Sequence, residues 1–79
     1  MKQKKIRLKS MDEARAFVNA AMKCDFDVNV FYNRVIIDAK SILGVMSLDF
    51  TKVLTVEYNG TNEAFETFLD ELAADVEAA

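Results

Sequence analysis

Histidine is missing from this 79-residue chain, and cysteine occurs once, at Cys24. Without histidine the chain has no imidazole metal ligand, no imidazole general base and no phosphohistidine chemistry. One cysteine excludes an internal disulfide. There is no Asp/Asn-rich calcium loop either, so the sequence predicts no metal site and no cofactor.

Proline is also absent, and glycine occurs only twice. We therefore find no linker, repeat or low-complexity stretch. A chain this short cannot divide its core, so residues 1–79 are expected to form a single domain. No apolar run approaches the roughly 20 residues that span a bilayer. Because no signal-peptide core follows the N-terminal lysines, we expect a cytoplasmic protein without membrane contact.

The composition, 52% hydrophobic and 29% charged, is typical of a globular domain. The net charge of -3 argues against direct binding of nucleic acid. The charges are unevenly placed, because every charged residue after Lys52 is acidic. The start of the chain is basic instead, with Lys2, Lys4, Lys5, Arg7 and Lys9. We expect a basic strand edge, guarded against aggregation, and an acidic last helix.

Alternating apolar residues predict strands, and apolar residues at helical spacing predict helices. Strands are expected over 5–9, 28–32, 35–39 and 53–58, and helices over 10–24, 41–48 and from 62 onward. The order is β-α-β-β-α-β-α, and helices this amphipathic need one shared apolar surface. The sequence therefore predicts an α+β sandwich with the helices on one face of the sheet.

Local signals mark several boundaries. Ser10 and Glu13 have the form of a capping box, in which each side chain bonds the backbone of the other. Asn33 and Arg34 are a plausible tight turn, because asparagine tolerates positive φ. Asn62 is suited to cap the last helix. Its apolar stripe comprises Phe65, Phe68, Leu69, Leu72 and Val76.

The short middle helix has more apolar surface than it can bury. Its apolar residues cover an arc of roughly 220°, whereas burying one stripe needs only about 100°. The surplus, Ile42, Leu43 and Met46, is expected to form an exposed patch suited to partner binding. The alternative is a helix sunk deeply between its neighbours, and the spacing alone does not decide between the two.

Two serines stand at helix starts. A phosphate on Ser41 would meet free backbone N–H groups, with Lys40 adjacent. The alternative for Ser41 is a simple N-cap, and the same choice applies to Ser10, whose capping box favours the structural role. Cys24 lacks a histidine to activate it, and Asp25 would raise its pKa, so it is interpreted as a buried packing residue.

The segment Lys-Ser-Ile-Leu-Gly-Val-Met-Ser-Leu at 40–48 closely resembles the serine-site segment of HPr, the phosphocarrier of the bacterial sugar phosphotransferase system. The element order, Ala-Phe-Val at 16–18 and Asn-Gly-Thr-Asn-Glu-Ala at 59–64 fit the same family. The resemblance implies an HPr-like open-faced β-sandwich with a four-stranded antiparallel sheet and three helices on one face. It also implies a protein that is not an enzyme.

When the family's motif is compared with this chain residue by residue, Ser41 resembles the serine that the family's ATP-dependent serine kinase/phosphorylase modifies. Ile42, Leu43 and Met46, with Lys40 beside them, match the surface through which HPr proteins dock on partners. Those partners include a LacI-type transcriptional repressor.

The family's phosphocarrier histidine is not kept. In HPr it takes phosphate from Enzyme I at the start of the first helix and is followed closely by an arginine and a proline. Ser10, Asp12 and Glu13 stand at those three positions. Two carboxylates repel a phosphoryl group, so phosphocarrier activity is not expected. Loss of the arginine also weakens the expected repressor contact.

A chain without the histidine but with the serine is similar to the Crh branch of the family, regulatory relatives of HPr in bacilli. The first hypothesis is therefore a regulatory protein phosphorylated on Ser41 and acting in carbon catabolite regulation. The rival is a phosphate-independent interaction or oligomerisation module on a degenerate HPr fold. A third possibility is a true carrier that uses Ser10 or Cys24 in place of histidine.

Overall fold

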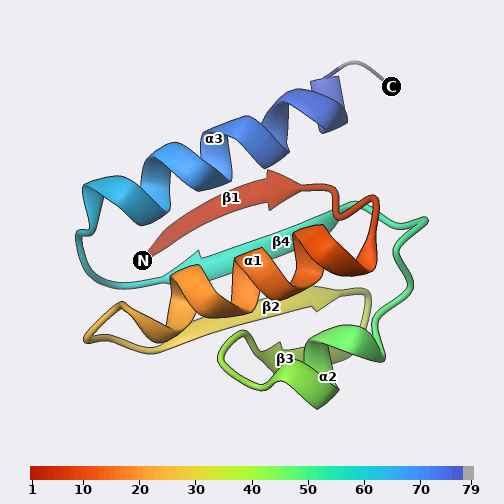
Figure 1. Cartoon of the computed structure of the whole chain (residues 1–79), viewed down its shortest axis with the longest axis horizontal. Helices are drawn as coiled ribbons and strands as arrows, with labels where there is room; N and C mark the ends of the chain where they lie inside the picture. Colours follow the sequence, from red (N-terminus) through yellow and green to blue (C-terminus); the bar gives the residue numbers. More distant parts are fainter. Residues whose placement is uncertain (78–79) are drawn as a thin grey trace.

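The structure, a computed structural model, describes residues 1–77 and arranges them as a sheet covered on one face by helices (Figure 1). Four strands and three helices are present in that range. They are β1 (Lys2–Ile6), α1 (Met11–Met22), β2 (Val28–Tyr32), β3 (Val35–Asp38), α2 (Ile42–Met46), β4 (Leu54–Tyr58) and α3 (Glu63–Glu77). The order β-α-β-β-α-β-α is as predicted.

The sheet has the strand order β1-β4-β2-β3, and every neighbouring pair is antiparallel. β4 and β2 lie in the middle, where Val56 pairs with Val30. The three helices lie on the same side of this sheet, with α3 along β1 and α1 in front of the central strands (Figure 1). The α+β class and the open-faced sandwich are confirmed.

The core lies between the sheet and the helices α1 and α3. Three aromatic rings meet at its centre: Tyr58 and Phe65 contact edge to face at 5.6 Å, and Phe17 lies 6.4 Å from Phe65. Each buries its ring almost completely. Burying a side chain of this size contributes roughly 1.5–3 kcal/mol, so the aromatic group is a main source of the attraction between α3 and the sheet.

The start of α1 follows the predicted cap with one correction. Ser10 Oγ accepts the backbone N–H of Glu13 at 3.1 Å, as a capping box requires. The Glu13 carboxylate accepts the N–H of Lys9 at 2.7 Å, and not that of Ser10 as predicted. The backbone of Ser10 is extended, with φ -151° and ψ 165°. In this conformation the N–H of Lys9, one residue before the cap, faces the Glu13 carboxylate.

The first strand begins and ends earlier than predicted. Ile6 and Leu8 are both buried, but the strand stops at Ile6 instead of extending to Lys9. Lys2 and Lys4 belong to β1 and lie on its helix side, where they form ion pairs with Glu66 and Asp70 of α3. β1 is an edge strand of the sheet, so the expected basic strand edge is confirmed, and the acidic helix α3 lies beside it.

The other helix and strand boundaries differ from the predicted ones by a few residues at most. The helix expected over 41–48 is regular only over Ile42–Met46, and the first helix ends at Met22, with Lys23 as its C-cap. Asn33 has a φ of 51° and forms the two-residue turn between β2 and β3, as predicted. Asn62 caps α3 by accepting the N–H of Phe65 at 3.0 Å.

Candidate functional site

Ser41 is exposed at the start of α2, immediately after β3. Its backbone is extended (φ -96°, ψ 107°), and its hydroxyl oxygen accepts the N–H of Gly44 at 3.2 Å. Its carbonyl oxygen accepts the N–H of Val45 at 2.9 Å. The serine therefore caps the helix, and the accessible hydroxyl can also accept a phosphoryl group. The two sequence interpretations of Ser41 are compatible in this geometry.

Gly44 lets α2 pack closely on the sheet. A Cβ atom at this position would lie 2.6 Å from Cγ2 of Ile37 on β3 and 3.2 Å from the Ser41 hydroxyl oxygen. Only a residue without a side chain therefore fits between the cap and the strand. The sequence reasoning did not single out Gly44, although a glycine inside a short helix was a usable signal.

The surface next to Ser41 is apolar, as the arc calculation predicted. Leu43 exposes 83% of its area and Ile42 exposes 41%, whereas Val45 and Leu48 are buried. Met46 is only partly exposed, because it packs against the core. The alternative of a deeply sunk helix is excluded for Ile42 and Leu43. We call Ile42, Leu43 and Met46 the α2 patch.

Lys40 precedes Ser41 but its ammonium group is directed elsewhere. Nζ donates a hydrogen bond to the carbonyl oxygen of Cys24 at 3.0 Å, at the end of α1. The Lys40 backbone N–H donates to Oδ1 of Asp38 at 2.9 Å. The half-buried lysine thus fixes the segment that carries Ser41, and a part for it in partner binding stays a prediction.

Cys24 is buried, with 5% of its area exposed. Burial raises the pKa of its thiol, Lys40 lowers it and Asp25 raises it again, with a net increase. Its sulfur atom contacts the carbonyl oxygen of Ala20 at 3.6 Å. A thiol with a raised pKa and little access is a poor nucleophile, so this environment matches the packing role.

The first turn of α1, where the resemblance places the family's histidine site, is acidic. Ser10 and Asp12 are exposed and Glu13 is half-buried. Carboxylates at this end of a helix are stabilised by its dipole, so the two acids favour the helix while they disfavour an anion. In this structure Ser10 and the two acids stabilise the start of α1.

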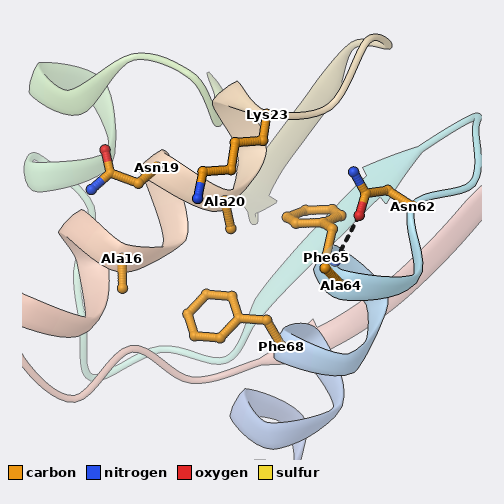
Figure 2. Close-up of a pocket in the computed structure, with 8 residues that line it drawn as sticks. All are labelled: Ala16, Asn19, Ala20, Lys23, Asn62, Ala64, Phe65 and Phe68. Carbon is orange, nitrogen blue, oxygen red and sulfur yellow. Dashed lines mark hydrogen bonds between the residues drawn. The ribbon is translucent and has the colours of Figure 1, made fainter.

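A groove of about 400 Å³ lies between α1 and α3 (Figure 2). Its lining consists of Ala16, Asn19, Ala20, Lys23, Asn62, Ala64, Phe65 and Phe68. The ring of Phe68 faces α1 across the groove, and the Asn62 side chain is occupied with capping α3 (Figure 2). Lys23 is its single titratable residue, so the groove has no set of groups for acid-base or nucleophilic chemistry.

A polar network joins β1 and β4 to α3. The Tyr58 hydroxyl donates to Oε1 of Glu66 at 3.0 Å, and Lys2 Nζ donates to the same oxygen at 3.2 Å. Burial, followed by the bond to Glu66, raises the pKa of Tyr58 to about 12. The bonds from Tyr58 and Lys2 lower the pKa of Glu66. Asp70 and Cys24 add smaller contributions that also raise the pKa of Tyr58. These shifts accompany a contact that joins β4 to α3.

Over the described residues 1–77, no group of three or more metal-ligating side chains is assembled. Within the same range, no helix is both long and apolar enough to cross a membrane.

The chain thus combines an open-faced antiparallel sheet with helices on one face, and it carries the capped Ser41 next to the α2 patch. The family model PTS-HPr, described as "PTS HPr component phosphorylation site", matches residues 10–78. This chain belongs to the PTS-HPr family. Members are phosphocarriers of the phosphotransferase system that interact with its kinases and enzymes, and they are not enzymes themselves.

Two solved structures are similar to this chain. HPr-C-His from Thermoanaerobacter tengcongensis has a TM-score of 0.75 and 28% identity, over 94% of this chain and 92% of that one. The phosphocarrier protein HPr from Bacillus anthracis str. Ames has a TM-score of 0.64 and 26% identity, over 92% of this chain and 93% of that one. The likeness therefore covers nearly the whole chain, which confirms the predicted fold.

Proposed function

We propose that this chain is a regulatory HPr-family protein, folded as one domain over residues 1–79, whose partner binding is switched by phosphorylation of Ser41. Phosphorylation transfers the terminal phosphoryl group of ATP to Ser41 Oγ, releases ADP and passes the hydroxyl proton to the kinase. The product carries close to two negative charges beside the α2 patch.

One observation carries this proposal: the exposed Ser41 is the N-cap of α2, and the two exposed apolar residues Ile42 and Leu43 follow it directly in the first turn. A partner that covers the α2 patch must therefore also cover the hydroxyl. Charge added at that point is then buried against the partner, and it either finds a cation there or disfavours the complex. Either result makes the binding sensitive to phosphate.

The start of α1 supports a regulatory role instead of a carrier role. The chain has no histidine, and Asp12 and Glu13 occupy the first turn where an incoming phosphoryl group would need positive charge. Ser10 is engaged as a cap, and Cys24 is buried with a raised thiol pKa. When the protein is incubated with phosphoenolpyruvate and Enzyme I, we expect that it does not become phosphorylated.

By its likeness to the Crh branch, the proposed role is in carbon catabolite regulation. The partners are then the serine kinase/phosphorylase of the family and a LacI-type transcriptional repressor. The repressor contact has to be made without the arginine of the first helix, because Asp12 stands there. A repressor that binds this chain is expected to supply its own cation for phosphoserine.

The test is the intact mass after incubation with the serine kinase of the family and ATP. Wild type is expected to gain one phosphoryl group, and Ser41→Ala is expected to gain none. Ser47→Ala, which alters an exposed serine at the other end of α2, is the matched control and keeps the modification. Phosphate on the Ser41→Ala protein, or on none of the three, contradicts the proposal.

The exposed α2 patch also supports a second function, a phosphate-independent interaction module. In that case a partner binds the patch constitutively and Ser41 serves only as a cap. The two differ in a binding assay done under phosphorylating conditions: equal binding by wild type and Ser41→Ala favours the second function. Loss of binding by Leu43→Lys is expected in both cases.

A further inference from the structure

The open face of the sheet, opposite the three helices, carries an aromatic ring in line with a lysine (Figure 1). Lys5 pairs with Thr55, and Thr55 pairs in turn with Phe31, so the three form one row across β1, β4 and β2. Each is next to a buried residue of its own strand, so the row faces away from the core. Phe31 is half-buried, and its partner on the edge strand β3, Ile36, exposes 69% of its area. The ring is therefore accessible from solvent.

A hollow of about 280 Å³ lies over the middle of this row. Its lining includes the three residues of the row and three from the segments that adjoin β2 and β4: Asn33, Lys52 and Val53. These segments add a second lysine, an amide and an apolar wall to the ring of Phe31. An apolar surface with a few convergent polar groups is typical of a site for a small molecule.

The fold does not use the two lysines of this hollow. Within residues 1–77, neither Lys5 nor Lys52 forms an ion pair or a side-chain hydrogen bond, whereas the other two lysines of β1 are paired with α3. Hydrogen bonds from Thr51, with a smaller effect of Lys52, lower the pKa of Asp49, and its carboxylate is engaged with Thr51. Two unpaired cations match a phosphate monoester, which carries close to two negative charges at neutral pH.

Glu57 is an acid on the same face, but it belongs to a different row. It follows Thr55 by two residues on β4 and pairs with Gln3, whose side-chain amide donates to Glu57 Oε2 at 2.8 Å. Glu57 lines a separate hollow beside Phe26. The described lining of the hollow around Phe31 thus holds two cations and no carboxylate, and its charge favours an anion.

We propose that this hollow binds a nucleoside monophosphate, with the base stacked on Phe31 and the phosphate held by Lys5 and Lys52. Stacking of a base on an aromatic side chain is favourable for every base, so the site is expected to bind purine and pyrimidine nucleotides alike. It shares no residue with the α2 patch and does not involve Ser41.

The hollow offers room for one base only. Phe31 is the single aromatic residue of the row, and Tyr32, which also lines the hollow, packs against the core. The net charge of -3 disfavours a long nucleic acid strand. The side chains of Asn33 and Thr55 form no hydrogen bond within the described part of the chain, so both are available to the polar groups of the ligand.

The test is a titration of the isotope-labelled protein with AMP at low salt and neutral pH, followed by the chemical shifts of the backbone amides. The amides of Phe31 and Thr55 are expected to shift, while that of Asn19 on α1 stays unchanged. Adenosine, which lacks the phosphate, and ribose phosphate, which lacks the base, are each expected to bind at least about tenfold more weakly than AMP.

Three variants assign the contacts. Phe31→Thr keeps a residue that favours strands and removes the ring, so AMP is expected to bind roughly tenfold more weakly. Lys5→Gln and Lys52→Gln are each expected to weaken binding roughly twofold to fivefold, with a smaller effect at high salt. Lys23→Gln, at an exposed lysine that ends α1, is the charge-matched control and is expected to leave binding unchanged.

A dissociation constant for AMP above about 5 mM overturns the proposal. So does equal binding of adenosine, since the lysines would then contribute nothing, or of ribose phosphate, since the ring would then contribute nothing. A loss with Lys23→Gln as large as that with Lys5→Gln would show attraction to overall charge instead of a site. A single-stranded oligonucleotide that binds more than about tenfold tighter than AMP would assign this face to RNA and overturn the single-nucleotide site.

Discussion

The ammonium nitrogen of Lys40 lies 3.0 Å from the carbonyl oxygen of Cys24, and this bond ties the segment before Ser41 to the end of α1. Lys40 and Cys24 lie 16 residues apart in the sequence. The contact explains why a residue next to the candidate phosphorylation site is half-buried. It also makes the geometry of Ser41 dependent on a helix that contributes no atom to the α2 patch.

Replacing Lys40 with methionine should test this tie, because methionine keeps much of the side-chain length and loses the donor. We expect a loss of about 1 kcal/mol in the free energy of unfolding, measured by urea denaturation. The pKa of Cys24 should also rise further, since Lys40 lowers it, and alkylation of the thiol at fixed pH should slow. Lys52→Met, at an exposed lysine, is the control, and equal losses in both variants would contradict the assignment.

Gly44→Ala should destabilise the protein even though alanine is the better helix former. The new Cβ would lie 2.6 Å from Cγ2 of Ile37, and overpacking of this kind costs about 1–3 kcal/mol. Thermal unfolding in a double-mutant cycle with Ile37→Ala checks the cause. If the crowding is responsible, Gly44→Ala costs less in the Ile37→Ala background than in wild type. An unchanged cost would show that the close approach to Ile37 is not the reason.

Alkaline pH should destabilise the protein through Tyr58. The pKa of Tyr58 is about 12 in the folded protein, against an ordinary value of 10.0, so folding resists ionisation of the phenol. This contribution is present in full below pH 10 and is lost as the pH rises from 10 toward 12. Ultraviolet absorbance of tyrosinate checks the titration, and the difference from Tyr58→Phe isolates it from Tyr32. Ionisation of Tyr58 near pH 10 in the folded state would overturn the expectation.

Acidic pH should weaken the same network through Glu66. The hydrogen bond from Tyr58, with that from Lys2, lowers the pKa of the Glu66 carboxyl below its ordinary 4.5. The folded state therefore gains stability from this group above that value and loses it as the pH falls through the lowered pKa. The unfolding free energy of wild type and Glu66→Gln, followed over this range, should differ most at neutral pH. A difference that does not depend on pH would rule out the ionised carboxylate as its source.

Much of the fold could be predicted because its signals are local. The Ser10 cap, the Asn33 turn and the Asn62 cap each depend on residues within a few positions, and the structure has all three. The exposure of part of α2 could also be predicted, because helical geometry limits how many of its apolar side chains one face can bury. Leu43 is exposed for that reason.

The start of the first strand could not be predicted from the sequence. Lys2 and Lys4 occupy positions on the helix-facing side of the strand, where an apolar residue would have indicated burial. Their ammonium groups are paired with Glu66 and Asp70, more than sixty residues later in the chain. The polar and apolar pattern of a five-residue strand holds no information about an ion-pair partner so far away in the sequence. The need for glycine at position 44 was missed for a similar reason, since the atom that excludes a Cβ belongs to β3.

The sequence by itself determined the order of the elements, their caps, the absence of histidine and the motif around Ser41, because these depend only on residue type and on near neighbours. The tertiary structure alone decided the strand order, the contact of Lys40 with Cys24 and the exposure of the β3 edge. Such features arise from contacts between segments far apart in the chain. They are fixed only when helices and strands pack their apolar faces on one another and leave some edges uncovered.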